Sequence, residues 1–129
     1  MNKNNKKGFT LAELLIVVAI IGVLVAISIP IFTSQLRKAR LATNQANARA
    51  AYAAAVSAYL TDDNVTGGTY YTGTGTFTNG GTLTGGTNAN SADIASWNLT
   101  NEPNLGNTAY KNWGITLNNG SVQTIAYAN

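Results

Sequence analysis

Few residues in this chain have the chemistry that catalysis requires. The chain has no cysteine and no histidine, so thiolate nucleophiles, imidazole bases and the commonest zinc ligands are missing together. Its five acidic residues are dispersed and form no clustered acid, base or metal site in the sequence. Asp62-Asp63-Asn64 could supply oxygens to calcium, but a calcium cage needs about six to eight oxygens and no regularly spaced ladder follows. We predict no enzyme, no cofactor and no metal site, and interpret Asp62 and Asp63 as a solvated helix exit.

Glu13 is the acidic residue with the least ordinary surroundings, because a long apolar run begins directly after it. A carboxylate in the first turn of a helix interacts favourably with the helix dipole, but it is costly to place in lipid. We therefore expect Glu13 to need a cationic partner.

The apolar run after Glu13 extends from Leu14 to Ser34, carries no charge and is 21 residues long. A bilayer core about 30 Å thick is crossed by about 20 helical residues, so the run predicts a membrane-spanning helix. A secretory signal peptide is the competing interpretation, although its apolar region usually has about 7–15 residues. A buried helix of a soluble protein would need a wider core than the remaining residues can build. Gly22 and Pro30 predict a kink or local unwinding within the helix.

The helix should continue well past the membrane and end between Leu60 and Gly67, because no Gly or Pro occurs from Thr33 to Asp63. One narrow face at helical spacing, here called the small-residue stripe, consists of Ala39, Ala42, Ala46, Ala50, Ala53, Ser57 and Leu60. A second face, the bulky stripe, consists of Leu41, Ala48, Tyr52, Ala55 and Tyr59. The rest of the surface is expected to be polar and to include Arg37 and Asn44. We infer that the bulky stripe packs on the rest of the chain and that the small-residue stripe lets neighbouring helices approach closely, although alanine is also simply a good helix former.

Residues 63–129 predict a small β-rich head, and its clearest feature is a hairpin from Trp113 to Tyr127 closed by Asn119-Gly120. A regular two-residue turn at that position pairs Leu117 with Val122. It also pairs Ile115 with Thr124 and Trp113 with Ala126.

The other head segments carry weaker signals. The stretch from Tyr70 to Thr87 predicts a second hairpin closed near Asn79-Gly80-Gly81, with an irregular loop as the alternative. Residues from Ile94 to Leu105 predict a loop that places apolar side chains on the sheet. The large aromatic side chains, which a sugar-binding platform would also use, are interpreted as the core of the head: Trp97, Tyr110 and Trp113.

The charge of the chain is concentrated near its start. The formal net charge is +3, but Lys3, Lys6 and Lys7 all precede Gly8, and the remainder has five basic and five acidic residues. Nucleic-acid binding therefore gains little support. Cytoplasmic flanks of membrane helices normally carry the excess of Lys and Arg. Here both flanks carry three basic residues, so charge does not predict the orientation of the span. The three that follow the span closely are Arg37, Lys38 and Arg40.

The segment Lys6-Lys7-Gly8-Phe9-Thr10-Leu11-Ala12-Glu13-Leu14 resembles the class III signal of type IV pilins and related pseudopilins. That motif has a basic leader ending in Gly, an apolar first mature residue, usually Phe, and Glu as the fifth mature residue. Gly8, Phe9 and Glu13 match it, and the short leader with Phe after the cut is similar to the type IVa group. Gly22 and Pro30 also fall where that family's helix commonly has Gly and Pro. The resemblance covers residues 6 to about 60.

The resemblance implies that prepilin peptidase cuts between Gly8 and Phe9 and methylates Phe9. It implies that the new α-amine is neutralised by Glu13 of an adjoining subunit, with a contact inside one chain as the alternative. Subunits would then leave the membrane and pack their helices in a filament, served by a pilus assembly platform and minor pilins. The N-terminus would be cytoplasmic and the head outside, and the assembled pilus extracellular.

The predicted fold is α+β, with one long N-terminal helix packed on a small antiparallel sheet. We expect a leader (1–8), an apolar transmembrane and filament-core helix (9–34), its amphipathic continuation (35–62) and an exposed head (63–129). The predicted function is a structural subunit, and in particular a major pilin, of a type IV pilus that serves adhesion, twitching motility or DNA uptake. One alternative is a pseudopilin of a type II secretion or competence machine. The other is a monomeric, helix-anchored surface binding module.

Overall fold

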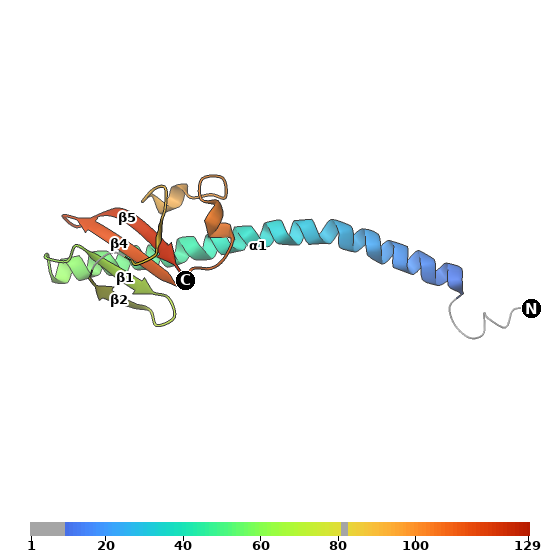
Figure 1. The fold of residues 1–129 in the computed structure, drawn as a ribbon, viewed down its shortest axis with the longest axis horizontal. Helices are drawn as coiled ribbons and strands as arrows, with labels where there is room; N and C mark the ends of the chain where they lie inside the picture. The colour runs from blue at the N-terminus through green and yellow to red at the C-terminus, as the bar shows by residue number, and fades with distance from the viewer. Residues whose placement is uncertain (1–9, 81–82) are drawn as a thin grey trace, which may run out of the picture. The chain divides into compact units, whose positions relative to one another are not determined.

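The computed structural model describes residues 10–80 and 83–129, so Gly8 and Phe9 lie outside the described residues. One helix comes first, α1 (Leu11–Thr61), followed by the strands β1 (Gly67–Tyr71), β2 (Thr76–Asn79) and β3 (Thr87–Asn88). Two short 3-10 helices, η2 (Ile94–Ser96) and η3 (Pro103–Gly106), precede β4 (Asn112–Asn118) and β5 (Ser121–Ala128) (Figure 1). The predicted α+β fold is confirmed. The chain divides into two compact units, one ending at Gln35 and one beginning at Leu36, which we call the head unit.

Helix α1 ends where the local sequence predicts, whereas Thr10, which the predicted helix (9–34) included, precedes it. Thr10 precedes its first turn, and the last helical residue is Thr61, within the predicted range of Leu60 to Gly67. The helix is continuous through Gly22 and Pro30, so the local unwinding expected there does not occur. Hydroxyl groups on either side of Pro30 donate to carbonyl oxygens one turn back, Ser28 to Leu24 at 2.7 Å and Thr33 to Ile29 at 3.0 Å. Such bonds help a helix to tolerate proline in an apolar environment.

In the head unit, the second half of α1 packs against one five-stranded sheet with the order β2-β1-β4-β5-β3 (Figure 1). All its strand pairs are antiparallel. The core between helix and sheet is formed by buried side chains from both, among them Ala48, Ala55, Trp113, Ile115 and Ile125.

The predicted hairpin is formed by β4 and β5, but its register differs from the regular one. Leu117 pairs with Val122 as expected, and Asn119 (φ 53°) and Gly120 (φ 84°) form the turn. The expected pairs of Ile115 with Thr124 and of Trp113 with Ala126 are wrong. Ile115 instead faces Ile125, and Trp113 faces Tyr127.

A β-bulge explains this difference. The register shifts between Thr116 and Leu117, so that Gln123 is an extra residue in β5. Because side chains alternate along a strand, the shift turns Ile125 and Tyr127 onto the face that carries Trp113 and Ile115. All four of these side chains are buried, which a regular register would prevent.

The weaker hairpin predicted from Tyr70 to Thr87 is wrong: β1 pairs with β2 across an earlier turn, and Thr87 in β3 pairs with β5 instead. The chain reverses at Thr72–Gly75, where the Gly75 N–H donates to the Tyr71 carbonyl at 2.8 Å and Gly75 has φ 67°. Closure there pairs Tyr70 with Phe77, whereas the Asn79-Gly80 signal only ends β2.

The long connection between β2 and β4 supplies anchors to the core, as predicted. Ile94 in η2, Trp97 after it and Leu105 in η3 are all buried. The rings of Trp97 and Trp113 stack with centroids 6.1 Å apart, and the ring of Tyr127 lies 5.8 Å from that of Trp113. The large aromatic side chains therefore form the core of the head, as predicted, and not an exposed sugar platform.

Candidate functional site

The start of α1 places Glu13 in a reciprocal pair with Thr10. The Glu13 N–H donates to the Thr10 hydroxyl oxygen at 3.2 Å, and the Thr10 N–H donates to the Glu13 carboxylate at 3.3 Å. This is a capping box, which satisfies two N–H groups that the first turn leaves without helical partners. Sequence analysis considered only a cationic partner for Glu13 and missed this pair, although Thr-x-x-Glu before an apolar run is its signature.

Beyond the cap, α1 exposes an apolar surface on every side. Large apolar side chains from Leu11 to Phe32 are between 44% and 74% exposed in the isolated chain. By length and composition α1 can cross a membrane. A methyl group added at Gly22 would meet no atom within 4 Å, so nothing within the described part of the chain requires glycine at this position. The roles predicted for Gly22 and Pro30 depend on what surrounds the helix.

In the head unit, α1 turns two different faces to the sheet and to solvent. On the bulky stripe, Ala48 and Ala55 are fully buried, and Leu41 and Tyr59 pack against the core. Tyr52 departs from this pattern and remains 42% exposed. Every member of the small-residue stripe is exposed: Ala39, Ala42, Ala46, Ala50, Ala53, Ser57 and Leu60. The helix therefore keeps an uncovered face of small side chains opposite the one that its own sheet covers.

Two polar residues of α1 fix the loop around η3, and sequence analysis placed both on the polar surface. Asn44 is fully buried, its amide donating to the carbonyls of Leu105 at 2.7 Å and Thr108 at 2.8 Å and accepting from the Tyr110 N–H at 2.9 Å. Arg37 donates to the Pro103 carbonyl at 3.0 Å and to the Asn107 side chain at 2.6 Å. No periodicity signal distinguishes a buried Asn from an exposed one, because its partners come from residues distant in sequence.

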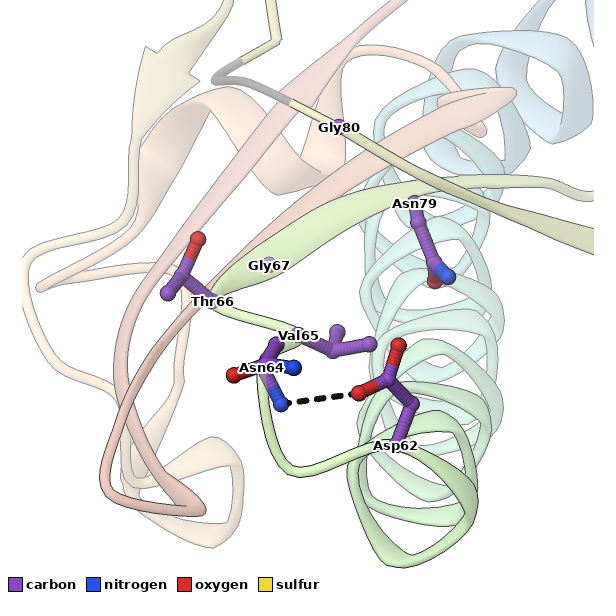
Figure 2. Close-up of a pocket in the computed structure, with 7 residues that line it drawn as sticks. All are labelled: Asp62, Asn64, Val65, Thr66, Gly67, Asn79 and Gly80. Carbon is purple, nitrogen blue, oxygen red and sulfur yellow. Dashed lines mark hydrogen bonds between the residues drawn. The ribbon is translucent and has the colours of Figure 1, made fainter.

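The exit of α1 has the geometry of a turn, not of a metal cage. Asp62 accepts a hydrogen bond from the Asn64 N–H at 3.0 Å and lines an open hollow of about 300 Å³ with Val65, Gly67 and Asn79 (Figure 2). Over residues 10–80 and 83–129, no three acidic side chains are grouped closely enough to hold a metal ion. Asp62 and Asp63 are both exposed, so this end of the helix presents negative charge to solvent.

The head core contains one phenol with a shifted pKa. Burial raises the pKa of Tyr127 above its ordinary value, and the nearby Glu102 and Tyr110 act in the same direction, while a hydrogen bond with Asn104 opposes them. Tyr127 therefore stays neutral and behaves as a core residue.

Comparison with known proteins identifies the N-terminal segment. Residues 3–29 match the family model of the prokaryotic N-terminal methylation motif. This segment therefore carries an N-terminal methylation motif. The matched range includes Gly8, Phe9, Glu13 and Gly22, whereas Pro30 and the small-residue stripe lie outside it.

The chain is similar to subunits of bacterial pili and fimbriae. It is 55% identical over 53 residues to the type IV narrow pilus major component PilA5 of Thermus thermophilus, which is 41% of this chain and 42% of that protein. It is 40% identical over 65 residues to fimbrial protein EcpC of Eikenella corrodens, which is 50% of this chain and 42% of EcpC. Fimbrial protein EcpB of the same organism is 53% identical over 36 residues, 28% of this chain and 23% of EcpB. The chain thus spans less than half the length of these curated relatives, and no solved structure matches it.

Proposed function

We propose that this chain is a subunit of a type IV pilus and that it polymerises through α1. The single observation that carries the proposal is the exposed surface of α1. The helix has an apolar segment exposed on every side and, further along, a small-residue stripe that the head leaves uncovered. An apolar surface of this extent is stable only in lipid or against other apolar chains.

Processing and membrane insertion follow from the N-terminal motif. We infer that prepilin peptidase cuts between Gly8 and Phe9 and methylates the new N-terminus at Phe9. The precursor then spans the cytoplasmic membrane, its N-terminus inside and its head outside, and pilus assembly machinery and minor pilins act on it. The capping box holds the Glu13 carboxylate on the Thr10 N–H, and we infer that this carboxylate pairs with the α-amine of an adjoining subunit.

The relatives favour a pilus subunit over a pseudopilin. PilA5 is the major component of a pilus, and EcpC and EcpB are fimbrial proteins. We therefore propose a major pilin, and we take adhesion, twitching motility and DNA uptake as the activities that its filament serves.

The decisive experiment measures the mass and N-terminal sequence of protein sheared from cells that carry the wild type or Glu13→Ala. Thr10→Ala is the matched variant, because it removes the hydroxyl of the capping box and keeps the carboxylate. We expect sheared chains that start at a methylated Phe9, loss of sheared protein with Glu13→Ala, and a smaller effect of Thr10→Ala.

A monomeric anchored module gives a different result. It predicts that every chain begins at Met1, stays in the membrane fraction and is unaffected by Glu13→Ala. That result would exclude polymerisation, whereas methylated chains that never leave the membrane would point to a pseudopilin.

A further inference from the structure

The head-unit part of α1 carries basic residues near its start, Arg49 near its middle and acidic residues just after its end. Near the start of this part of the helix lie Lys38, which is exposed, and Arg40, which is half-buried; we call them the basic end. Arg37 beside them is already hydrogen-bonded to Pro103 and Asn107. At the other end lie Asp62 and Asp63, both exposed, which we call the acidic end. At a rise of about 1.5 Å per residue, the two ends are about 36 Å apart.

The acidic end lies where the electrostatic field of its own helix is unfavourable for carboxylates. The C-terminus of a helix carries a partial negative charge, which favours cations and disfavours carboxylates. The last turn of α1 contains no basic residue to compensate. The Asn64 N–H stabilises the carboxylate of Asp62, but no basic residue of the last turn balances the charge of Asp63, and a break in such a local rule is expected at functional positions.

We propose that the acidic end of one copy pairs with the basic end of a second copy of this chain, and that this contact sets the axial offset between these two copies, which are a different pair from the copies that Glu13 joins. The inference rests on the proposed polymerisation. If parallel helices packed through the small-residue stripe without an offset, like charges would lie side by side. An offset of about 36 Å along the helix brings opposite charges together instead.

The geometry of this contact explains why it would favour a filament over a closed pair. Each copy carries one acidic and one basic end, so the contact is heterologous, and a copy that uses its acidic end still offers its basic end to the next. Heterologous contacts that do not close into a ring generate open helical filaments. An exposed ion pair contributes little to the free energy of association. The small-residue stripe fixes the register between two helices only weakly, so even a small contribution can select one register.

Charge reversal with rescue tests the proposal in the full chain expressed in its own host. The single variants are Lys38→Glu and Asp63→Lys, and the third variant combines them. Asp63 is preferred to Asp62 because Asp62 also accepts the Asn64 N–H at the helix exit. Asp93→Lys is the matched control, since Asp93 is exposed and makes no side-chain cap bond to η2. The measured quantity is the ratio of sheared fibre to chain retained in the membrane.

We expect each single reversal to lower this ratio several-fold, the double reversal to restore it, and Asp93→Lys to leave it unchanged. Normal fibres from both single variants would overturn the proposal, as would a double variant no better than the worse single one. If Lys38→Glu instead lowers the amount of chain in the membrane and the double variant does not recover, the basic end contacts lipid headgroups and the proposal is wrong. If the wild type also forms no sheared fibres, the proposed function fails. If the wild type forms fibres, a defect of the variants concerns the contact between the acidic and basic ends alone.

A cross-link locates the contact directly, because the chain contains no cysteine. In fibres of the double variant Ala39→Cys/Asn64→Cys, which places exposed cysteines beside Lys38 and Asp63 and keeps both charges, a bifunctional thiol reagent should produce a ladder of multimers, since each copy has two different neighbours. Each single cysteine variant should give no ladder. Fibres of the double variant that yield only uncross-linked chains would contradict the inferred offset.

Discussion

Asn44 joins α1 to a loop that is distant in sequence, and it does so with an amide that has both a donor and an acceptor. Its three bonds satisfy backbone groups of Leu105, Thr108 and Tyr110 that the surrounding chain does not pair. Alanine would leave these groups buried without partners, and each such group costs about 1–3 kcal/mol. The side chain is therefore a stability determinant of the head.

Asn44→Ala is expected to lower the free energy of unfolding of the head by about 2–4 kcal/mol. The full chain in mild detergent would be heated while the near-UV circular dichroism of stacked Trp97 and Trp113 is followed, because this signal reports the head and not the apolar helix. Asn47→Ala, one turn further on and only half-buried, should change stability by less than about 0.5 kcal/mol. Equal effects of the two substitutions would argue against a specific role for Asn44.

At the scale of elements, the β4–β5 turn fits closely against α1. Asn119 and Gly120 both have positive φ, which matches a two-residue hairpin turn. A Cβ atom at Gly120 would lie 2.6 Å from the ring of Tyr59, so the turn needs glycine both for its backbone and for the helix beside it.

Gly120→Ala should destabilise the head by about 1–3 kcal/mol, partly through backbone strain and partly through contact with the Tyr59 ring. The double variant Gly120→Ala/Tyr59→Ala should lose less than the sum of the two single variants, because the contact is then absent while the strain remains. Gly73→Ala is the matched control, since its Cβ would meet no atom within 4 Å, and it should be neutral or slightly stabilising. Strict additivity in the thermal unfolding series would exclude the contact with Tyr59.

The hairpins also show which features of the elements a sequence can predict. Helix length, the end of α1 and the Asn119-Gly120 turn depend on neighbouring residues, and all three were predicted. The bulge at Gln123 was missed because its cause is tertiary, namely the gain from burying Ile125 and Tyr127 together with Ile115. The local sequence pattern predicted the strand β5, whereas burial of its side chains against the helix selected its register.

The same distinction applies to the candidate site. The motif around Gly8, Phe9 and Glu13 is short and local, so the sequence sufficed to recognise it. The partners of Asn44 and Arg37 lie in the η3 loop, whose position depends on the whole head unit. The exposure of the small-residue stripe was inferred from helical spacing, and its predicted contacts with other subunits lie outside a single chain.

At the scale of the whole molecule, the structure covers apolar surface on one side of α1 only. The sheet buries Ala48 and Ala55, while the segment from Leu11 to Phe32 stays exposed. Apolar surface in water costs about 25 cal/mol per Å², so a chain that leaves the membrane must find other apolar surface for this segment. In the proposed filament, helices of further copies would provide it, provided that they approach closely, and small side chains permit that approach.

Ala46→Leu and Ala53→Leu, singly and together, test whether the small-residue stripe serves this purpose. Both residues are exposed, and leucine is a good helix former, so the unfolding temperature of the head should hardly change. The added side chains would hold neighbouring helices apart, so the amount of sheared fibre should fall while mature chain accumulates in the membrane.

Ala95→Leu is the control for this series, because Ala95 is an exposed alanine in η2 and does not belong to the small-residue stripe. It adds the same side chain at another place on the head and should leave fibre yield at the wild-type level. If the double stripe variant also yields normal fibres, the stripe does not pack against other subunits, and the alanines reflect helix propensity alone. If fibre yield and head stability fall together, the stripe contributes to folding of the single chain and not specifically to assembly.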